Sequence, residues 1–263
     1  MRKSIRVASI AAACAVAGAA LYGTGAASAH TSGTKTHEPE NIATLVSQID
    51  TYYGGTKDSA GVWSASPDSL YAADVAHIES DAKKDIKKAV KKAAKPGEKP
   101  AIVLDIDDTS LLSYDFEKAT NFTYSSSGWT NYIKTTTRQA VFGMPELVAY
   151  AKSKGVEVFF LSGLDASLRS YTTANLDTVG YKTALDTDHV FLKDKVNPPS
   201  YLSSCATAAS WTCTTVQYKE GTRKYIESEG YNIIGSFGDQ QSDLDGGYAD
   251  KTYKIPNPTY FVA

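Results

Sequence analysis

The sequence predicts an α/β fold in which helices cover both faces of a parallel β-sheet. Two short runs, residues 101–104 and 156–161, are rich in Val, Ile, Leu and Phe and are typical of strands buried on both faces. Segments with apolar residues at helical spacing alternate with such runs, which is the pattern of a layered α/β protein. The chain has 263 residues and is 42% hydrophobic and 21% charged, which is enough for one domain with a sizeable core.

The chain begins with the pattern of a secretory signal peptide. Three basic residues open it, an Ala- and Val-rich stretch follows, and Ala27-Ser28-Ala29 forms a small-x-small cleavage site. We therefore expect cleavage near Ala29 and a secreted, extracellular protein. The remaining chain would comprise a flexible polar start, residues 30–38, and a folded domain, residues 39–263.

The charge that remains after this cleavage is negative. Loss of the three basic residues would take the formal net charge from −2 to −5, which argues against a nucleic acid polymer as a partner. No apolar run of 18 or more residues follows the signal peptide, so we expect no stable membrane insertion. The sequence gives no indication of the oligomeric state.

Two helices are expected before the first buried strand. Residues 39–53 have apolar residues at helical spacing and end at Gly54-Gly55. Residues 67–94 form a longer helix, with Ser66 as the N-cap and Pro67 as the first helical residue. Lysines fill one side of this longer helix. They are interpreted as a solvated helix face, with attraction of anionic substrates or surfaces as the alternative.

The stretch after the first buried strand is expected to be a cap insertion. Residues 110–137 are polar and aromatic, and they directly follow a strand that ends in carboxylates. Such an insert could cover a site at that strand end. Its rings either stack on a substrate or pack the cap itself, and the sequence leaves both alternatives open. The rings belong to Tyr114, Phe116, Phe122, Tyr124, Trp129 and Tyr132.

Strands and helices then alternate to the end of the sequence. We expect helices at residues 145–154, 168–176 and 218–229, and strands at residues 156–161, 190–192, 231–234 and 252–255. Residues 196–215 are expected to form an irregular loop. Strands joined through helices run parallel, so the predicted fold is a Rossmann-like three-layer α/β/α sandwich with a parallel sheet, N-terminal helices and a small cap insertion.

Two carboxylates follow the first buried strand directly. Asp105 and Asp107 lie two residues apart, so they point to the same side if the strand continues through them. The carboxyl ends of parallel strands share one edge of the sheet, where ligands bind. Neighbouring carboxylates repel one another unless a cation lies between them, and hard oxygen ligands suit Mg²⁺. A surface turn in which Asp108-Thr109 caps a helix is the alternative, but it does not explain Asp105 and Asp107.

Further polar residues follow in an order that resembles a known family. Ser162 follows the second buried strand, Lys219 opens a helix, and Asp239 and Asp243 follow the fourth strand. Together with the motif DIDDT that starts at Asp105, this order resembles the four motifs of the haloacid dehalogenase (HAD) superfamily, which are DxDxT, Ser or Thr, Lys, and GDxxxD.

The flanking residues are similar to one branch of this superfamily. The run KPAIVL before Asp105 and the motif GDQQSDL at residues 238–244 resemble the secreted acid phosphatases of HAD subfamily IIIB. That branch includes class B- and class C-like enzymes and plant vegetative storage proteins. Tyr218-Lys219, with Arg223 four residues further on, is another similarity. The resemblance covers residues 99–260.

The resemblance implies a role for each matching residue. Asp105 would be the nucleophile that forms an aspartyl-phosphate, and Asp107 would protonate the leaving oxygen and then activate water. Phosphate oxygens would be held by Ser162, the Gly163 amide and Lys219. Mg²⁺ would be held by the Asp105 carboxylate, the Asp107 carbonyl, Asp239 and Asp243.

The implied function is a secreted, Mg²⁺-dependent phosphomonoesterase of the acid phosphatase type that acts on a small phosphomonoester. Two alternatives remain: a nucleotidase or phosphotransferase that uses the same residues, and a non-catalytic storage or binding protein on the same fold. The sequence departs from the branch at Asp108, where Glu is usual, and at Leu164, where Arg is frequent. Arg169 could supply that missing cation. Residues 110–137 do not match the usual cap, so the substrate preference of the branch does not transfer.

Two cysteines remain after signal cleavage, because Cys14 lies in the signal peptide. An even pair in an exported protein indicates a disulfide between Cys205 and Cys213. A metal site is the alternative, but no nearby His or third Cys completes one.

Overall fold

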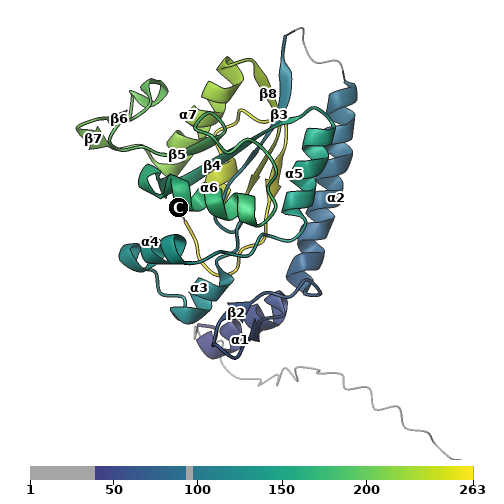
Figure 1. Cartoon of the computed structure of the whole chain (residues 1–263), viewed down its shortest axis with the longest axis vertical. Helices are drawn as coiled ribbons and strands as arrows, with labels where there is room; N and C mark the ends of the chain where they lie inside the picture. The colour runs from purple at the N-terminus through teal and green to yellow at the C-terminus, as the bar shows by residue number, and fades with distance from the viewer. Residues whose placement is uncertain (1–38, 93–96, 263) are drawn as a thin grey trace, which may run out of the picture. The chain divides into compact units, whose positions relative to one another are not determined.

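A parallel sheet of five strands forms the centre of the structure (Figure 1). The computed structural model describes residues 39–92 and 97–262. The strand order is β5-β4-β3-β8-β9, and each neighbouring pair runs parallel, which confirms the predicted α/β class. The strands are β3 Lys99–Leu104, β4 Glu157–Asp165, β5 Val190–Lys193, β8 Tyr231–Gly238 and β9 Thr252–Lys254.

Strand β3 lies in the middle of the sheet, and its side chains pack into two cores. Ala101 and Val103 belong to a cluster that includes side chains of helix α7, Thr215–Ser228. Ile102 and Leu104 belong to a second cluster, with side chains of helices α2, α5 and α6. Alternate strand residues point to opposite faces, so these helices cover both faces of the sheet (Figure 1). The three-layer α/β/α sandwich is confirmed. The helices of the second cluster are α2 Leu70–Lys91, α5 Met144–Ser153 and α6 Arg169–Thr178.

Both N-terminal helices begin later than predicted. Helix α1 spans Ile42–Tyr53, because the Asn41 side chain accepts hydrogen bonds from two amides of its first turn. In α2 the N-cap is Ser69 and not Ser66, because the Ser69 hydroxyl accepts from an amide of the first turn. Ser66 instead accepts from the amide of Asp68 in the turn before α2.

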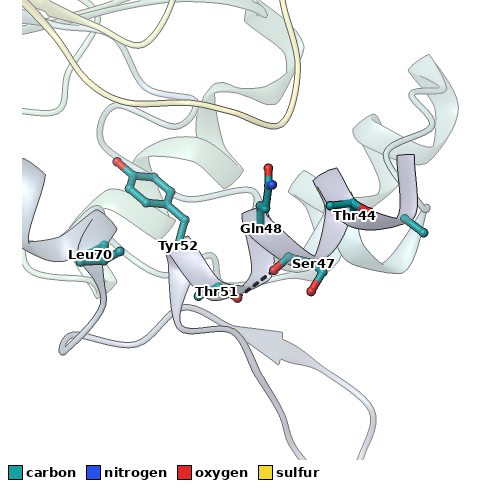
Figure 2. A pocket seen from close by; sticks show the side chains of 7 residues that line it. Thr44, Ser47, Gln48, Thr51, Tyr52 and Leu70 are labelled. Atoms are coloured by element: carbon teal, nitrogen blue, oxygen red, sulfur yellow. Dashed lines mark hydrogen bonds between the residues drawn. The ribbon is translucent and has the colours of Figure 1, made fainter. Parts of the chain in front are cut away.

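Helix α1 buries less of its apolar stripe than the spacing indicates. Ile49 is buried, but Ile42 and Leu45 remain 76% and 41% exposed. The outer side of α1 and the start of α2 form an open hollow (Figure 2). This hollow presents hydroxyl and amide groups and no charged group, so it lacks the chemistry expected at a phosphate site. Its lining residues are Ala43, Thr44, Ser47, Gln48, Thr51, Tyr52 and Leu70.

Short elements interrupt stretches that have no periodic pattern. A two-stranded ribbon of β1, Thr56–Lys57, and β2, Trp63–Ser64, connects α1 to α2. The expected irregular loop at residues 196–215 contains a 3₁₀ turn, Ser200–Leu202, and a second ribbon. Strands of two residues are too short to produce a recognisable alternation, which is why the sequence does not predict them. The second ribbon consists of β6 Ala206–Thr207 and β7 Ser210–Trp211.

The insert at residues 110–137 folds into two short helices, α3 Tyr114–Ala119 and α4 Ser126–Thr135. Three of its rings pack against one another, with centroids between 4.9 and 5.4 Å apart. The three rings belong to Phe116, Trp129 and Tyr132. Phe116 and Tyr132 are buried and pack the insert itself, whereas Trp129 is only partly buried and leaves both alternatives open.

Strands β4 and β8 are longer than predicted. Strand β4 continues to Asp165, so Ser162 and Gly163 lie within it and not after it. Strand β8 continues to Gly238, which makes Asp239 the first residue beyond the strand. The apolar runs end before the strands do, because Ser162 and Gly163 in β4 and Gly235 and Ser236 in β8 interrupt the hydrophobic pattern.

Helix α7 begins three residues before its predicted start. Thr214 and Gln217 form a capping box, in which each side chain bonds to the other residue's backbone. Lys219 was expected to open this helix, but it lies in the second turn of α7.

Two predictions fall on residues 1–38. The signal peptide at residues 1–29 and the flexible start at residues 30–38 lie outside the part of the chain that the structure describes. Among the described helices, none is long and apolar enough to cross a bilayer.

The predicted disulfide between Cys205 and Cys213 is present. It encloses the ribbon of β6 and β7, and Cys213 is next to Thr214, the N-cap of α7. Cys213 also belongs to the buried cluster on the α7 face of the sheet. The bond thus attaches the ribbon to the start of the helix that carries Lys219.

Replacing both cysteines with Ala should lower the free energy of unfolding by about 2–3 kcal/mol, because the disulfide removes entropy from the unfolded chain even across a short loop. Urea denaturation of the oxidised wild type and the double variant measures this difference. A reducing agent should shift the wild-type midpoint and leave that of the double variant unchanged. Equal midpoints for the oxidised wild type and the double variant would contradict the expectation.

Candidate active site

The backbone of β3 brings Asp105 to the carboxyl edge of the sheet. The Asp105 amide donates to the carbonyl of Phe237 in β8 at 2.9 Å, although β3 itself ends at Leu104. The chain then turns within residues 106–111. Strand alternation does not continue through Asp107, so its direction is set by the turn and by its own partners.

Lys219 of α7 lies against the carboxylate of Asp105. Its ammonium group donates to one oxygen of Asp105 and lies 2.7 Å from an oxygen of Asp243. Carboxylate oxygens of Asp105, Asp239 and Asp243 lie within 4.8 Å of one another. All four side chains are more than nine-tenths buried. One buried ammonium group thus lies among three buried carboxylates.

The turn after β8 positions two of these carboxylates. Gly238 is required in this turn because a Cβ atom there would lie 2.4 Å from the Cβ of Asp243. Asp243 also accepts a hydrogen bond of 2.9 Å from the amide of Gln240, which caps the short helix α8, Gln241–Leu244. The glycine and the capping contact together explain the spacing of the GDxxxD motif in terms of packing.

Arg223 attaches this turn to helix α7. Its buried guanidinium group donates to the carbonyl oxygens of Asp243, Asp245 and Gly247. Lys219 lies one helical turn earlier on α7. Helix α7 therefore supplies the ammonium group directly and holds the backbone of Asp243 through Arg223.

Asp107 has its own cation. Its carboxylate lies 2.6 Å from a guanidinium nitrogen of Arg138 and accepts a bond of 3.3 Å from the Ser162 hydroxyl. Arg138 is 1% exposed, and the Ser162 hydroxyl in turn accepts from the amide of Leu164 at 3.1 Å. Asp105 and Asp107 are therefore paired with different cations.

Asp239 is held by neutral donors. Its carboxylate accepts from the Thr109 hydroxyl at 3.2 Å, from the Gln240 side-chain amide at 2.6 Å and from the Asn257 side-chain amide at 2.8 Å. Gln240 also accepts a bond of 3.0 Å from the amide of Val262. The segment at residues 257–262 is thereby attached beside Asp239.

These groups line a cavity of about 490 Å³. Its wall comes from the carboxyl edge of the sheet with α7 and α8, from the insert at residues 110–137, and from residues 260–262. Lys193, the last residue of β5, also lines it, and a Cβ on Gly163 would lie 3.6 Å from the Lys193 ammonium nitrogen. Gly163 and the ammonium group of Lys193 thus lie close together at the cavity wall. Predicted site residues in the lining are Asp105, Asp107, Gly163, Lys219, Asp239 and Asp243.

Burial and like charge shift the pKa values in this cluster. Burial raises the pKa of Asp105 well above its usual value against the effect of Lys219, and Asp243 and Asp239 add to the rise. Burial and Asp243 likewise raise the pKa of Asp239. For Lys219, burial alone would lower the pKa, but Asp105 and Asp243 outweigh it and the pKa is raised. The carboxylates carry more charge than one ammonium group offsets, and three buried oxygen donors fit a hard divalent cation such as Mg²⁺.

Ser162 and Arg169 do not lie where their expected contacts with a phosphate would require. Ser162 is fully buried and bonded to Asp107, and the cavity lining contains its neighbour Gly163 instead. Arg169, considered as a substitute cation, donates to the carbonyl of Val190 at 2.6 Å and is absent from the lining. Arg169 therefore does not replace the missing cation of the Ser162 motif.

Three charged residues of this region were not predicted from the sequence. Lys193 directly follows the apolar run at residues 190–192, which is the same signal that indicated Asp105, so it could have been found. Arg138 lies in an irregular connection, and Glu117 lies in a helix of the insert, where no pattern distinguishes them. Their positions depend on how the insert packs, which single-sequence patterns do not encode.

Residues 63–263 match the family model of the HAD superfamily, subfamily IIIB (Acid phosphatase). The chain belongs to this family. The subfamily IIIB assignment covers the whole sheet, all four motifs and the insert. It confirms the resemblance that the sequence motifs indicated.

Individual relatives of this subfamily IIIB chain match a smaller part of it. It is 33% identical over 165 residues to Stem 28 kDa glycoprotein of Glycine max and 26% identical over 164 residues to Vegetative storage protein 1 of Arabidopsis thaliana. Both matches cover 61% of the chain, and 59% and 54% of the respective relative, so the chain spans little more than half the length of these proteins.

A solved structure shows the same fold. The class C acid phosphatase from Bacillus anthracis superposes with a TM-score of 0.56 at 22% sequence identity, covering 73% of this chain and 78% of that chain.

Replacing Arg138 with Met should lower the free energy of unfolding by about 3 kcal/mol, because removal of one partner from a buried ion pair leaves the other charge uncompensated. The change is measured by urea denaturation. Lys182→Met is the matched control, because the Lys182–Asp177 pair is 70% and 64% exposed and should contribute little. A loss for Arg138→Met no greater than that of the control would show that Arg138 is not needed to compensate Asp107.

Proposed function

We propose that this protein is a secreted, Mg²⁺-dependent phosphomonoesterase that acts through an aspartyl-phosphate intermediate. The observation that carries the proposal is the position of Asp105, a buried carboxylate bonded to Lys219 at the wall of a cavity that also contains Asp239 and Asp243. Membership of an acid phosphatase subfamily supports the reaction class. Phosphoryl transfer depends on positioning and charge compensation, which these residues supply.

In the proposed reaction a carboxylate oxygen of Asp105 attacks the phosphorus atom, and the bond to the leaving oxygen breaks. Asp107 gives a proton to that leaving oxygen, so a neutral alcohol departs. In the second half, Asp107 takes a proton from water, whose oxygen attacks the phosphorus atom and releases inorganic phosphate and the Asp105 carboxylate. The contact with Arg138 holds the carboxylate of Asp107 in position at the cavity wall.

The phosphate group would be held by cations and a backbone amide. Lys219 and Lys193 line the cavity together with Gly163, whose N–H is proposed to donate to a phosphate oxygen. Ser162 is proposed to act through Asp107, since its hydroxyl donates to that carboxylate. Lys193 is thus proposed to take the place of the Arg that other members of the branch carry after the Ser162 motif.

Mg²⁺ would be held by the carboxylates of Asp105, Asp239 and Asp243, with the backbone carbonyl of Asp107 as a further ligand. When bound, the ion offsets the carboxylate charge and polarises the phosphate group. Thr109, Gln240 and Asn257 hold Asp239 and would orient it towards the ion.

The domain organisation is proposed as expected from the sequence: a signal peptide at residues 1–29, a catalytic domain at residues 39–263 and a cap at residues 110–137. The cap assignment is supported by the contribution of the insert to the cavity wall. Secretion is supported by the disulfide, which is typical of oxidising compartments.

A storage protein without catalysis is the second candidate function. The relatives named vegetative storage proteins favour it. The presence of Asp105 and its contact with Lys219 favour the enzyme, because a storage role requires neither.

Hydrolysis of p-nitrophenyl phosphate by the purified protein, with Mg²⁺ and with excess EDTA, tests the enzyme against the storage protein. Turnover that depends on Mg²⁺ supports the proposal. No turnover across pH 4–8 with Mg²⁺ present would favour the storage function. A nucleoside monophosphate and a sugar phosphate, assayed in parallel, then test the nucleotidase alternative.

Replacing Asp105 with Asn should reduce p-nitrophenyl phosphate hydrolysis at least a thousandfold, because the neutral amide is a poor nucleophile, while the circular dichroism spectrum stays unchanged. Asp188→Asn removes an exposed carboxylate outside the cavity and should retain activity. Activity above a few per cent in folded Asp105→Asn would exclude Asp105 as the nucleophile.

Binding of Mg²⁺ should raise the melting temperature, because a ligand of the folded state stabilises it by about 2.7 kcal/mol at one hundred times its dissociation constant. Differential scanning calorimetry with EDTA and with increasing Mg²⁺ measures the shift. In Asp239→Ala the midpoint of this titration should move to higher Mg²⁺, because one ligand is lost. A melting temperature independent of Mg²⁺ would remove the metal from the proposed site.

A further inference from the structure

Glu117 is a buried carboxyl group that the proposed reaction does not use. It lies in α3 of the insert, is 6% exposed and contributes to the wall of the cavity. Among the described residues, no side chain bonds to its carboxylate, and burial raises its pKa to about 7. Its oxygens are not among the fully buried side-chain atoms that lack a partner in the described structure, so the carboxyl group is open to the cavity, where a polar group from a ligand can bind to it.

Its neighbours on α3 show that the lack of a partner is particular to Glu117. Asp115 accepts a bond of 2.5 Å from the Tyr132 hydroxyl, and Lys118 lies 2.7 Å from Asp50. Neither of them lines the cavity. The one charged residue of α3 that faces the cavity is therefore also the one without a protein partner in the described structure.

Aromatic rings line the same cavity and are open to a ligand. Tyr124 and Phe261 are 67% and 79% exposed and have no ring or cation partner among the described residues. Phe122, Trp129 and Tyr260 complete the aromatic part of the lining. Aromatic faces attract cations, and this attraction is strongest where water is excluded.

The charge of the cavity favours a cation as well. Five carboxyl groups and two ammonium groups line it, and the guanidinium group of Arg138 behind the lining offsets one of the five, Asp107. A divalent metal ion and the dianionic phosphate of a substrate cancel each other, so the lining keeps its negative excess when both are bound. Lys193 and Lys219 lie beside Gly163 and Asp105, at the proposed phosphate end, and the carboxyl group of Glu117 has no such cation.

We infer that the leaving-group part of this cavity takes a positively charged group, so that the preferred substrates are phosphate monoesters of alcohols that carry an ammonium group. Glu117 compensates the charge of this group, and the rings of Tyr124 and Phe261 pack against its methyl or methylene groups. This inference rests on the proposed phosphomonoesterase function and names the substrate class for the same site. A neutral, hydroxyl-rich leaving group would leave the excess charge uncompensated.

The test compares two substrates that differ only in charge. Phosphocholine carries a quaternary ammonium group, and 3,3-dimethylbutyl phosphate has the same shape with a carbon atom in place of the nitrogen. The ratio of their kcat/KM values is measured at pH 7.5 with Mg²⁺, and p-nitrophenyl phosphate serves as a general substrate. We expect the wild type to favour phosphocholine by about tenfold or more.

The variant Glu117→Gln keeps the shape of the side chain and removes its charge. It should bring the ratio close to one, mainly by reducing kcat/KM for phosphocholine, and leave hydrolysis of 3,3-dimethylbutyl phosphate within about twofold. Asp115→Asn is the matched control, because it removes the same charge from the same helix outside the cavity lining. It should keep the wild-type ratio.

The possible results separate this inference from the proposed function. The inference is overturned if the wild type hydrolyses 3,3-dimethylbutyl phosphate and its kcat/KM for phosphocholine is no higher. The proposed phosphomonoesterase function would stand in that case. An equal loss for both substrates in Glu117→Gln also overturns it, because it assigns Glu117 a structural role. Absence of any phosphatase activity removes the proposed function and the inference together. The wild-type ratio needs no variant, so poor folding of Glu117→Gln does not prevent a decision.

Discussion

The constraint on which this structure depends is the concentration of negative charge at one buried edge of the sheet. Carboxylate oxygens of Asp105, Asp239 and Asp243 lie within 4.8 Å of one another, and Lys219 is the ammonium group that contacts Asp105 and Asp243 directly. Burying a charge without a partner is strongly unfavourable, so each carboxylate needs fixed donors or a cation. The surrounding contacts follow from this need: neutral donors surround Asp239, Arg223 holds the backbone of Asp243, and Asp107 pairs with Arg138.

The parts of the fold that the sequence predicts are those whose pattern is local. The run at residues 101–104 alternates between two cores, and this is enough to identify a central strand and to place Asp105 at its end. Helix α2 is predicted because its stripe repeats over five turns, although its start is displaced, since Ser66 and Ser69 are equally good caps on sequence alone. The disulfide is predicted because only two cysteines, Cys205 and Cys213, lie outside the expected signal peptide at residues 1–29.

The parts that the sequence does not predict depend on contacts between distant segments. Arg138 becomes important only because the connection after the insert passes beside Asp107, 31 positions earlier. The role of Asn257 likewise exists only because its segment returns to Asp239, 18 positions earlier. The motif order identified Lys219, but its position in the second turn of α7 depends on a capping box that starts the helix three residues before the expected start. Such long-range geometry leaves no periodic signal in one sequence.

The way in which residues 260–262 are attached has a consequence for how the protein can change during evolution. Gln240 bonds to the carbonyl of Tyr260 and to the amide of Val262, which are backbone groups present in nearly every residue type. The side chain of Phe261, which lines the cavity and is 79% exposed, takes no part in this attachment. Substitutions at position 261 can therefore reshape the cavity without loosening Asp239. The wall of the cavity and the charged cluster can diversify separately, so relatives with one shared charged centre can come to accept different molecules.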